Sequence, residues 1–239
     1  RSRRELAYEW WVKSIEFKND IGLEQVEIFW YPNVGSNNNN LPDTLYHWAG
    51  KPGELSAAVL RAQGMPVPLT EVLGRTDLII APTEFSATAP LKMLAKVHNF
   101  RGTTMPGFIP SMLPSLGLDY AKVHERIMQL KTRLDAAERE VMIFTARGVD
   151  YVFDADLRYR TATASSGMFR DDMVVGNLPS GETYIVPYEG EREGEPSKTR
   201  GTLPVQFGDE IVLYRVEGNR AVEVLTEGER SSAERAYLE

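Results

Sequence analysis

The chain contains no cysteine among its 239 residues. Disulfide bonds, thiolate nucleophiles and cysteine-based zinc sites are therefore excluded, because each of them needs the cysteine sulfur. Disulfides are rare in the cytoplasm, so a chain without cysteine is compatible with that compartment. The sequence accordingly predicts a cytoplasmic protein.

Long apolar runs and an excess of positive charge are also missing. No run approaches the roughly 20 apolar residues that a membrane-spanning helix needs, and no signal peptide is visible. The formal net charge is −7, so the chain has no general basic field of the kind that attracts nucleic acid. We therefore expect no membrane partner and no nucleic-acid partner.

Several catalytic and nucleotide-binding fingerprints are absent. No G-x-G-x-x-G follows a predicted strand, no G-x-x-x-x-G-K-[ST] occurs, and the Ala-Ser-Ser-Gly segment at 164–167 lacks the G-x-S-x-G pattern of a nucleophile elbow. The three histidines, His47, His98 and His124, form neither H-E-x-x-H nor a close pair. Because a metal site needs converging ligands, we interpret each of them as structural or solvent-facing.

The residues that are present fit an ordinary globular protein, with 42% hydrophobic and 26% charged residues. Hydrophobic spacing and turn residues in the first part predict helices and strands in alternation. The expected helices cover 6–21, 55–63, the stretch after Thr88 and 119–138, and the expected strands cover 25–31, 77–81 and 101–105. This order predicts the α/β class, with a wound, mostly parallel sheet covered by helices.

Beyond Glu140 the pattern changes to short strands separated by turns. They are expected at 141–145, 151–153, 183–186, 210–216 and 221–225, the last two forming a hairpin. We therefore predict two domains, an α/β wound domain over 1–139 and a smaller β-rich domain over 140–239. The chain starts without methionine and stops inside a helical pattern, so the second domain is expected to be truncated at its C-terminus.

One carboxylate stands out because of its position. Glu182 follows the turn Asn177-Leu-Pro-Ser-Gly181 and precedes the strand-forming Thr-Tyr-Ile-Val. A side chain held between a turn and a strand suits a metal ligand or a general acid or base. It equally suits a hairpin carboxylate that accepts hydrogen bonds from nearby amides. Asp171 and Asp172 could join it if the chain folds back, although adjacent acids are more typical of a solvated turn.

Two segments resemble a known family. Residues 147–153 (Arg-Gly-Val-Asp-Tyr-Val-Phe) are similar to the G-T-D-L-type start of a strand in the aminopeptidase T-like metallopeptidases. Residues 176–190 (Gly-Asn-Leu-Pro-Ser-Gly-Glu-Thr-Tyr-Ile-Val-Pro-Tyr-Glu-Gly) are similar to the family's G-N-L-P-x-G-E-V-F-x-x-P-x-E segment. The resemblance is close over about residues 140–190 and looser elsewhere.

The resemblance implies a metal-dependent enzyme that removes N-terminal residues from peptides, acts as a homodimer and uses zinc, cobalt or a similar divalent metal. It implies that Glu182 is a metal ligand. The family's other ligands, a second Glu, two His and an Asp, and its assisting Tyr match no segment here, and no histidine follows Gly190. We therefore expect the chain by itself to bind metal weakly or not at all and to be inactive.

Two alternatives stay open. Ring-opening mononuclear non-haem iron dioxygenases share much of the same scaffold, so the resemblance is compatible with a dioxygenase that acts on a hydroxylated ring. The third hypothesis is a non-catalytic binding or assembly module. The metal count and the ligand set would distinguish the two enzymes.

Overall fold

The computed structural model describes residues 2–171 and 173–238. Its contacts divide the chain into two compact units. Unit 1 comprises 1–124 and 165–181, and unit 2 comprises 125–164 and 182–239. The chain therefore passes from one unit to the other after His124, Ala164 and Gly181, whereas the sequence suggested a single change at Glu140.

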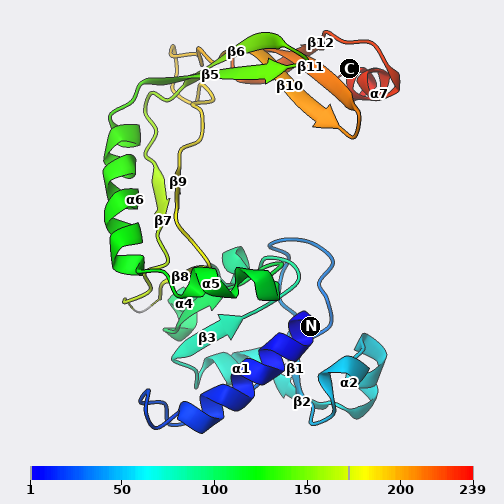
Figure 1. The fold of residues 1–239 in the computed structure, drawn as a ribbon, viewed down its shortest axis with the longest axis vertical. Helices are drawn as coiled ribbons and strands as arrows, with labels where there is room; N and C mark the ends of the chain where they lie inside the picture. The colour runs from blue at the N-terminus through cyan, green and yellow to red at the C-terminus, as the bar shows by residue number, and fades with distance from the viewer. Residues whose placement is uncertain (1, 172, 239) are drawn as a thin grey trace. The chain divides into compact units, whose positions relative to one another are not determined.

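Unit 1 contains most of the helices (Figure 1). Its helices are α1 (Arg3–Phe17), α2 (Ala57–Gln63), α3 (Leu69–Leu73), α4 (Thr88–His98), α5 (Leu113–Leu116) and the first turn of α6 (Tyr120–Asp135), with 3₁₀ turns η1 (Pro52–Glu54) and η2 (Pro110–Met112). Its strands are β1 (Thr44–His47), β2 (Met65–Pro68), β3 (Leu78–Ala81), β4 (Arg101–Thr104) and β8 (Val175–Asn177). No helix in the described residues is long and apolar enough to cross a membrane.

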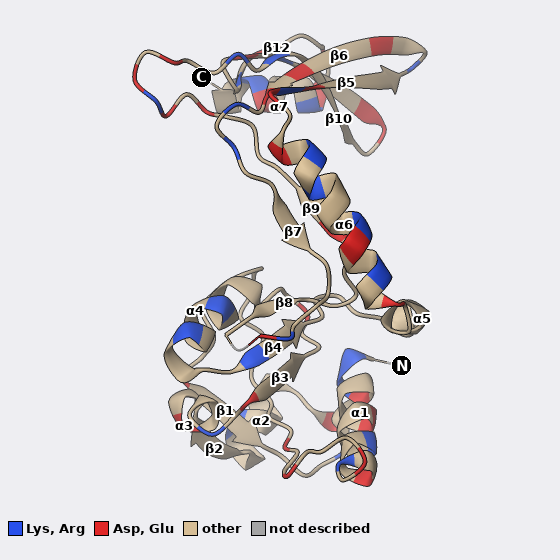
Figure 2. Ribbon diagram, turned by 90° about the vertical axis from the view of Figure 1, so that its left-hand side faces the viewer, with Lys and Arg blue, Asp and Glu red and all other residues tan. Residues whose placement is uncertain are grey.

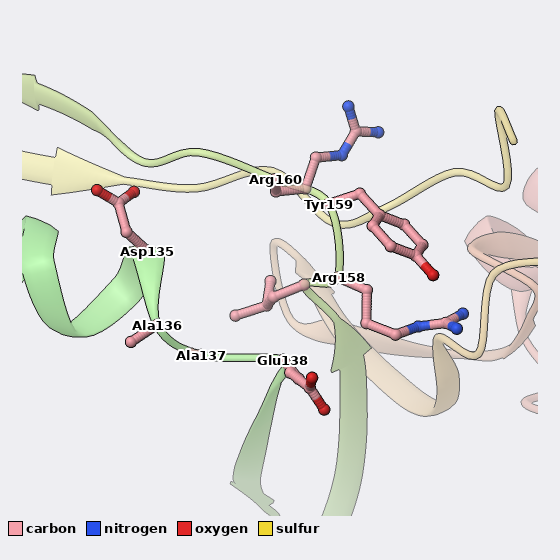
Figure 3. A pocket seen from close by; sticks show the side chains of 8 residues that line it. Asp135, Ala136, Ala137, Glu138, Arg158, Tyr159 and Arg160 are labelled. Carbon is pink, nitrogen blue, oxygen red and sulfur yellow. The ribbon is translucent and has the colours of Figure 1, made fainter.

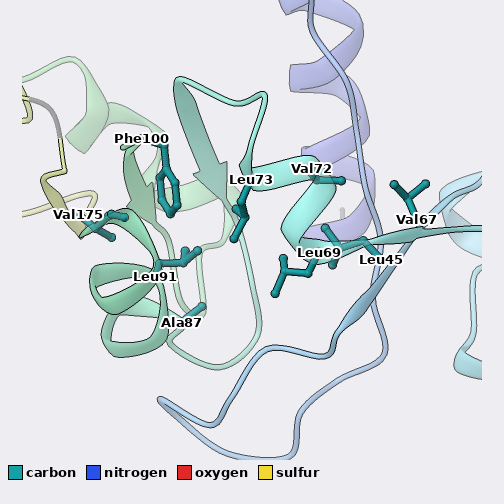
Figure 4. Packing of buried hydrophobic residues seen from close by; sticks show 10 residues of the cluster. Leu45, Val67, Leu69, Val72, Leu73, Ala87, Leu91, Phe100 and Val175 are labelled. Carbon is teal, nitrogen blue, oxygen red and sulfur yellow. The ribbon is translucent and has the colours of Figure 1, made fainter. Parts of the chain in front are cut away.

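A three-stranded parallel sheet in the order β3-β4-β8 forms the centre of unit 1. Helix α4 connects β3 to β4, and its buried side chains Leu91 and Ala95 join Phe100 in the main core cluster of this unit (Figure 4). The predicted strands at 77–81 and 101–105 are confirmed. Strand β3 lies at the edge of the sheet, and its Leu78 and Ile80 side chains are exposed.

The N-terminal part of unit 1 departs from the predicted helix–strand order. Helix α1 ends at Phe17, and the predicted strand over 25–31 is absent except for an isolated bridge between Trp30 and Tyr46. The strand that is present there is β1, which pairs antiparallel with β2. A strand forms only where a partner strand is available for pairing. In 25–31 only Trp30 bridges to β1, whose ladder is formed with β2.

Unit 2 is dominated by a five-stranded sheet in the order β12-β11-β10-β6-β5. All its pairings are antiparallel. The strands are β5 (Arg139–Ala146), β6 (Val149–Asp156), β10 (Arg200–Phe207), β11 (Glu210–Glu217) and β12 (Arg220–Val224), and helix α7 (Glu229–Leu238) packs on β11 and β12. Strand β7 (Thr163–Ser165) pairs with β9 (Glu182–Tyr184) in a separate two-stranded sheet.

Two locally encoded elements formed as predicted. Strands β11 and β12 make the expected hairpin, with Glu217 opposite Arg220. Helix α6 begins after Asp119, whose Oδ1 accepts hydrogen bonds from the amides of Ala121 and Lys122, both at 3.2 Å. Figure 2 shows acidic and basic residues interspersed along α6 and over both units.

The predicted fold class is wrong. The parallel sheet has three strands and the larger sheet is antiparallel, so the fold contains mixed sheets rather than a wound, mostly parallel sheet. The third parallel strand, β8, comes from residues 175–177, far along the chain from β4. Hydrophobic spacing identifies strands but carries little information about which distant strands pair.

Candidate functional site

Glu182 is the first residue of β9, directly after the turn that was predicted to hold it. Its side chain is exposed, and it has no hydrogen-bond or ion-pair partner among the described residues. The strand that follows is shorter than expected and ends at Tyr184. The carboxylate is therefore exposed to solvent and makes no hydrogen bond to the hairpin amides among the described residues.

The other candidate ligands do not converge on Glu182. Within 2–171 and 173–238, no three His, Asp or Glu side chains are grouped so that they could hold a metal ion. His47 lies 3.4 Å from the carboxylate of Glu27, and His124 contacts Ser166. Asp171 is exposed, and Asp172 lies outside the described residues. The donors present therefore do not fit a catalytic metal, which needs several ligands to offset its dehydration.

A polar cluster that sequence reasoning missed occupies the carboxyl ends of β4 and β8. Asn177 Oδ1 accepts hydrogen bonds from the hydroxyls of Thr88 (2.6 Å) and Thr104 (2.7 Å). Thr88 is the first residue of α4, and Ser86 Oγ lies 2.9 Å from its hydroxyl. In α/β sheets this end of parallel strands is where ligands bind. Here the oxygens satisfy one another, so the cluster positions the motif that begins at Gly176.

A second missed cluster lies in unit 2 at the end of β6. The Asp156 carboxylate is buried and accepts hydrogen bonds from Nε and Nη2 of Arg158, at 3.0 and 2.8 Å. It also accepts one from the amide of Lys198 at 2.9 Å. The pKa of Asp156 is lowered to about 2, mainly by the side-chain hydrogen bonds from Arg158. The signal in the sequence was an Asp-x-Arg at the end of a strand, a pattern too common to single out.

A pocket of about 300 Å³ adjoins this cluster (Figure 3). It is lined by Asp135, Ala136, Ala137, Glu138, Leu157, Arg158, Tyr159 and Arg160. Three of its four charged side chains are already paired: Arg158 binds Asp156 and Glu195, Arg160 binds Glu191, and Asp135 accepts hydrogen bonds from Lys131 and from the amide of Ala162, whereas Glu138 has no such partner among the described residues. The pairing indicates that these side chains hold the loops after β6 together rather than bind an ionic ligand.

Comparison with known proteins bears on the fold. No protein-family model matches the sequence, and no curated protein matches it. The fold is similar to the solved structure of a 2,5-dihydroxypyridine dioxygenase from Pseudomonas putida KT2440, with a TM-score of 0.50 and 18% sequence identity. The similarity covers 70% of this chain and 47% of the dioxygenase chain. The chain thus spans about half the length of a dioxygenase whose fold it shares in part.

Proposed function

We propose that this chain forms part of a ring-cleaving dioxygenase that acts on a hydroxylated ring. The observation that supports the proposal is the structural likeness to a dioxygenase over 70% of the chain. A likeness at 18% identity concerns the fold alone, and fold is only an analogy for function. The proposal therefore names the reaction class and leaves the ring itself open.

Glu182 is the residue of this chain that we propose for the metal site. It sits in the motif at 176–190 and is exposed at the start of β9. A single carboxylate does not hold a catalytic iron, zinc or cobalt ion. The remaining ligands of such a site would have to come from outside the described residues, so no reaction step is assigned to this chain's side chains.

An aminopeptidase is the second candidate, favoured by the sequence similarity of residues 176–190 to the metallopeptidase segment. A peptide substrate and a homodimer belong to this candidate. The two enzymes differ in reaction: a dioxygenase consumes one O₂ per ring and places both oxygen atoms in the product, whereas a peptidase consumes water. Oxygen uptake therefore separates them.

The test uses the natural protein that contains this chain. We expect it, supplied with Fe(II), to take up oxygen in equal amount to the 2,5-dihydroxypyridine lost from the absorbance spectrum, while leucine 4-nitroanilide stays intact. The Glu182→Ala variant should lose at least about 100-fold in rate if Glu182 binds the metal, and Glu189→Ala is the matched control. Peptide hydrolysis without oxygen uptake, or no oxygen uptake with any member of a panel of hydroxylated pyridines and benzenes, contradicts the dioxygenase proposal.

Metal binding by the 239-residue chain alone gives a separate prediction. Because affinity rises with the number of converging ligands, we expect dissociation constants weaker than about 1 μM for zinc and for Fe(II) under anaerobic conditions. Isothermal titration calorimetry measures them directly. Sub-micromolar binding that disappears in Glu182→Ala would show that the described residues do build a site.

A further inference from the structure

We propose that Ser166 and His124 form a nucleophile–base pair that accepts acyl groups from small activated esters. Ser166 Oγ lies 2.9 Å from His124 Nδ1. This is the distance at which an imidazole removes a hydroxyl proton directly. His124 lies on α6 and Ser166 directly follows β7, so the tertiary fold brings together two residues that are distant in the sequence. The activity requires no metal and is independent of the proposed dioxygenase function.

The turn that carries Ser166 is anchored on the side of β7. The carbonyl oxygen of Ser165 accepts hydrogen bonds from the amide of Gly181 at 3.1 Å and from Ser180 Oγ at 2.7 Å. The backbone directly before Ser166 is therefore held in place. A fixed backbone reduces the conformational freedom that a nucleophile would lose on reaction.

The other side of the turn is anchored on α6. Gly167 has φ +76°, and a Cβ at this position would lie 2.4 Å from the ring of Tyr120. That ring is itself positioned by a hydrogen bond from its hydroxyl to the carbonyl oxygen of Ser115 at 3.1 Å. Tyr120 and His124 are four residues apart, so they share one face of the helix. The same helix face thus positions both the turn and the base.

The surroundings of Ser166 also suit an acyl intermediate. Among the described residues, the amides of Gly167 and Met168 have no hydrogen-bond acceptor. In serine hydrolases the amide after the nucleophile stabilises the oxyanion. His124 is exposed and Ser166 is half-buried, so a small ester can reach the pair from solvent.

The reaction balances without any further reactant except water. Ser166 Oγ forms a bond to the ester carbonyl carbon, and its proton passes to His124 Nδ1. The ester C–O bond breaks, and the alcohol leaves with the bonding electron pair and takes up the proton. Water then attacks the acyl-serine, releases the carboxylic acid and restores the Ser166 hydroxyl.

The experiment follows 4-nitrophenol release from 4-nitrophenyl acetate and locates the acetyl group by mass spectrometry of peptides quenched in acid. We expect a single acetyl group on Ser166. Ser166→Ala should remove it and His124→Gln should slow its formation at least about 100-fold, the contribution of a general base. A metal chelator should leave the rate unchanged.

The matched controls are Ser36→Ala, an exposed serine in a loop, and His98→Gln, a histidine at the end of α4. Both are expected to keep the wild-type rate. Circular dichroism verifies that each variant is folded. An unchanged rate in folded Ser166→Ala, or acetyl groups on lysines or on His124 with Ser166 unmodified, overturns the proposal and leaves a surface hydrogen bond.

Discussion

Replacing Asp156 by alanine is expected to lower the free energy of unfolding of unit 2 by about 3 kcal/mol, because removing one partner of a buried ion pair leaves the other charge unpaired. The Asp156 side chain is 2% exposed and that of Arg158 15%. The carboxylate also binds the amide of Lys198, so its loss detaches the loop before β10. Urea denaturation followed by far-ultraviolet circular dichroism measures the change.

Asp154→Ala is the matched control for Asp156→Ala. Asp154 pairs with Arg139 at 2.7 Å, but the Arg139 side chain is 65% exposed, and exposed pairs contribute less than about 1 kcal/mol. Equal destabilisation by the two substitutions would show that the buried pair has no special role. All four tryptophans precede Lys51 and lie in unit 1, so tryptophan fluorescence reports on unit 1 and serves as an internal reference.

The Asp156 carboxylate makes the free energy of unfolding of unit 2 depend on pH. Arg158 lowers the pKa of Asp156 from 3.8 to about 2, so the folded state binds this proton less readily than the unfolded state does. The resulting stabilisation, about 2 kcal/mol, is complete above pH 4 and is lost as the pH falls from about 4 to about 2. Asp156→Asn should lack this part of the acid transition.

Replacing Gly201 by alanine is expected to destabilise unit 2 by about 3 kcal/mol or more. Gly201 has φ +140°, and a Cβ there would lie 2.3 Å from the carbonyl oxygen of Val152 and 2.7 Å from Cα of Phe153. Both clashes involve backbone atoms, which cannot rotate away. Gly201 pairs with Phe153 where β10 meets β6. Hydrogen exchange of the β6 and β10 amides should therefore increase more than that of the β11–β12 hairpin.

Gly208→Ala separates the steric effect from the loss of glycine itself. Gly208 also has a positive φ, +59°, but a Cβ there would meet no atom within 4 Å. The Gly208→Ala substitution should therefore lower the free energy of unfolding by only about 1 kcal/mol, the cost of placing alanine in this backbone conformation. If the two alanine variants lose the same stability, the close approach of β10 to β6 is not what requires glycine at position 201.

The elements that could be predicted from sequence are those whose information is local. Helix α6 was recognisable from its hydrophobic spacing and from Asp119, and the β11–β12 hairpin from two strand patterns joined by a Gly-Asn turn. The position of Glu182 after a bend was also correct. Each depends on residues a few positions apart, and short-range backbone preferences act at that distance.

The candidate sites were much less predictable. The Asn177 cluster joins residues from α4, β4 and β8, the Asp156 cluster joins β6 to the loop before β10, and the Ser166–His124 pair spans α6 and the end of β7. The segment 164–167 lacks the nucleophile-elbow pattern, and Ser166 contacts a histidine 42 positions away in the sequence. No spacing rule reports such a contact.

The sequence by itself identified helices α1, α2, α4 and α6, strands β3, β4, β5, β6, β9, β11 and β12, and the absence of cysteine chemistry, since these follow from each residue's own properties and its near neighbours. It did not identify α3, α5, β1, β2, β7, β8 or β10. Only the tertiary structure decided that β8 completes a parallel sheet with β4, that the larger sheet is antiparallel, and that Glu182 belongs to no metal-holding group of side chains within 2–171 and 173–238. The physical reason is that strand pairing and side-chain convergence are settled by competition among distant segments for burial and hydrogen bonds.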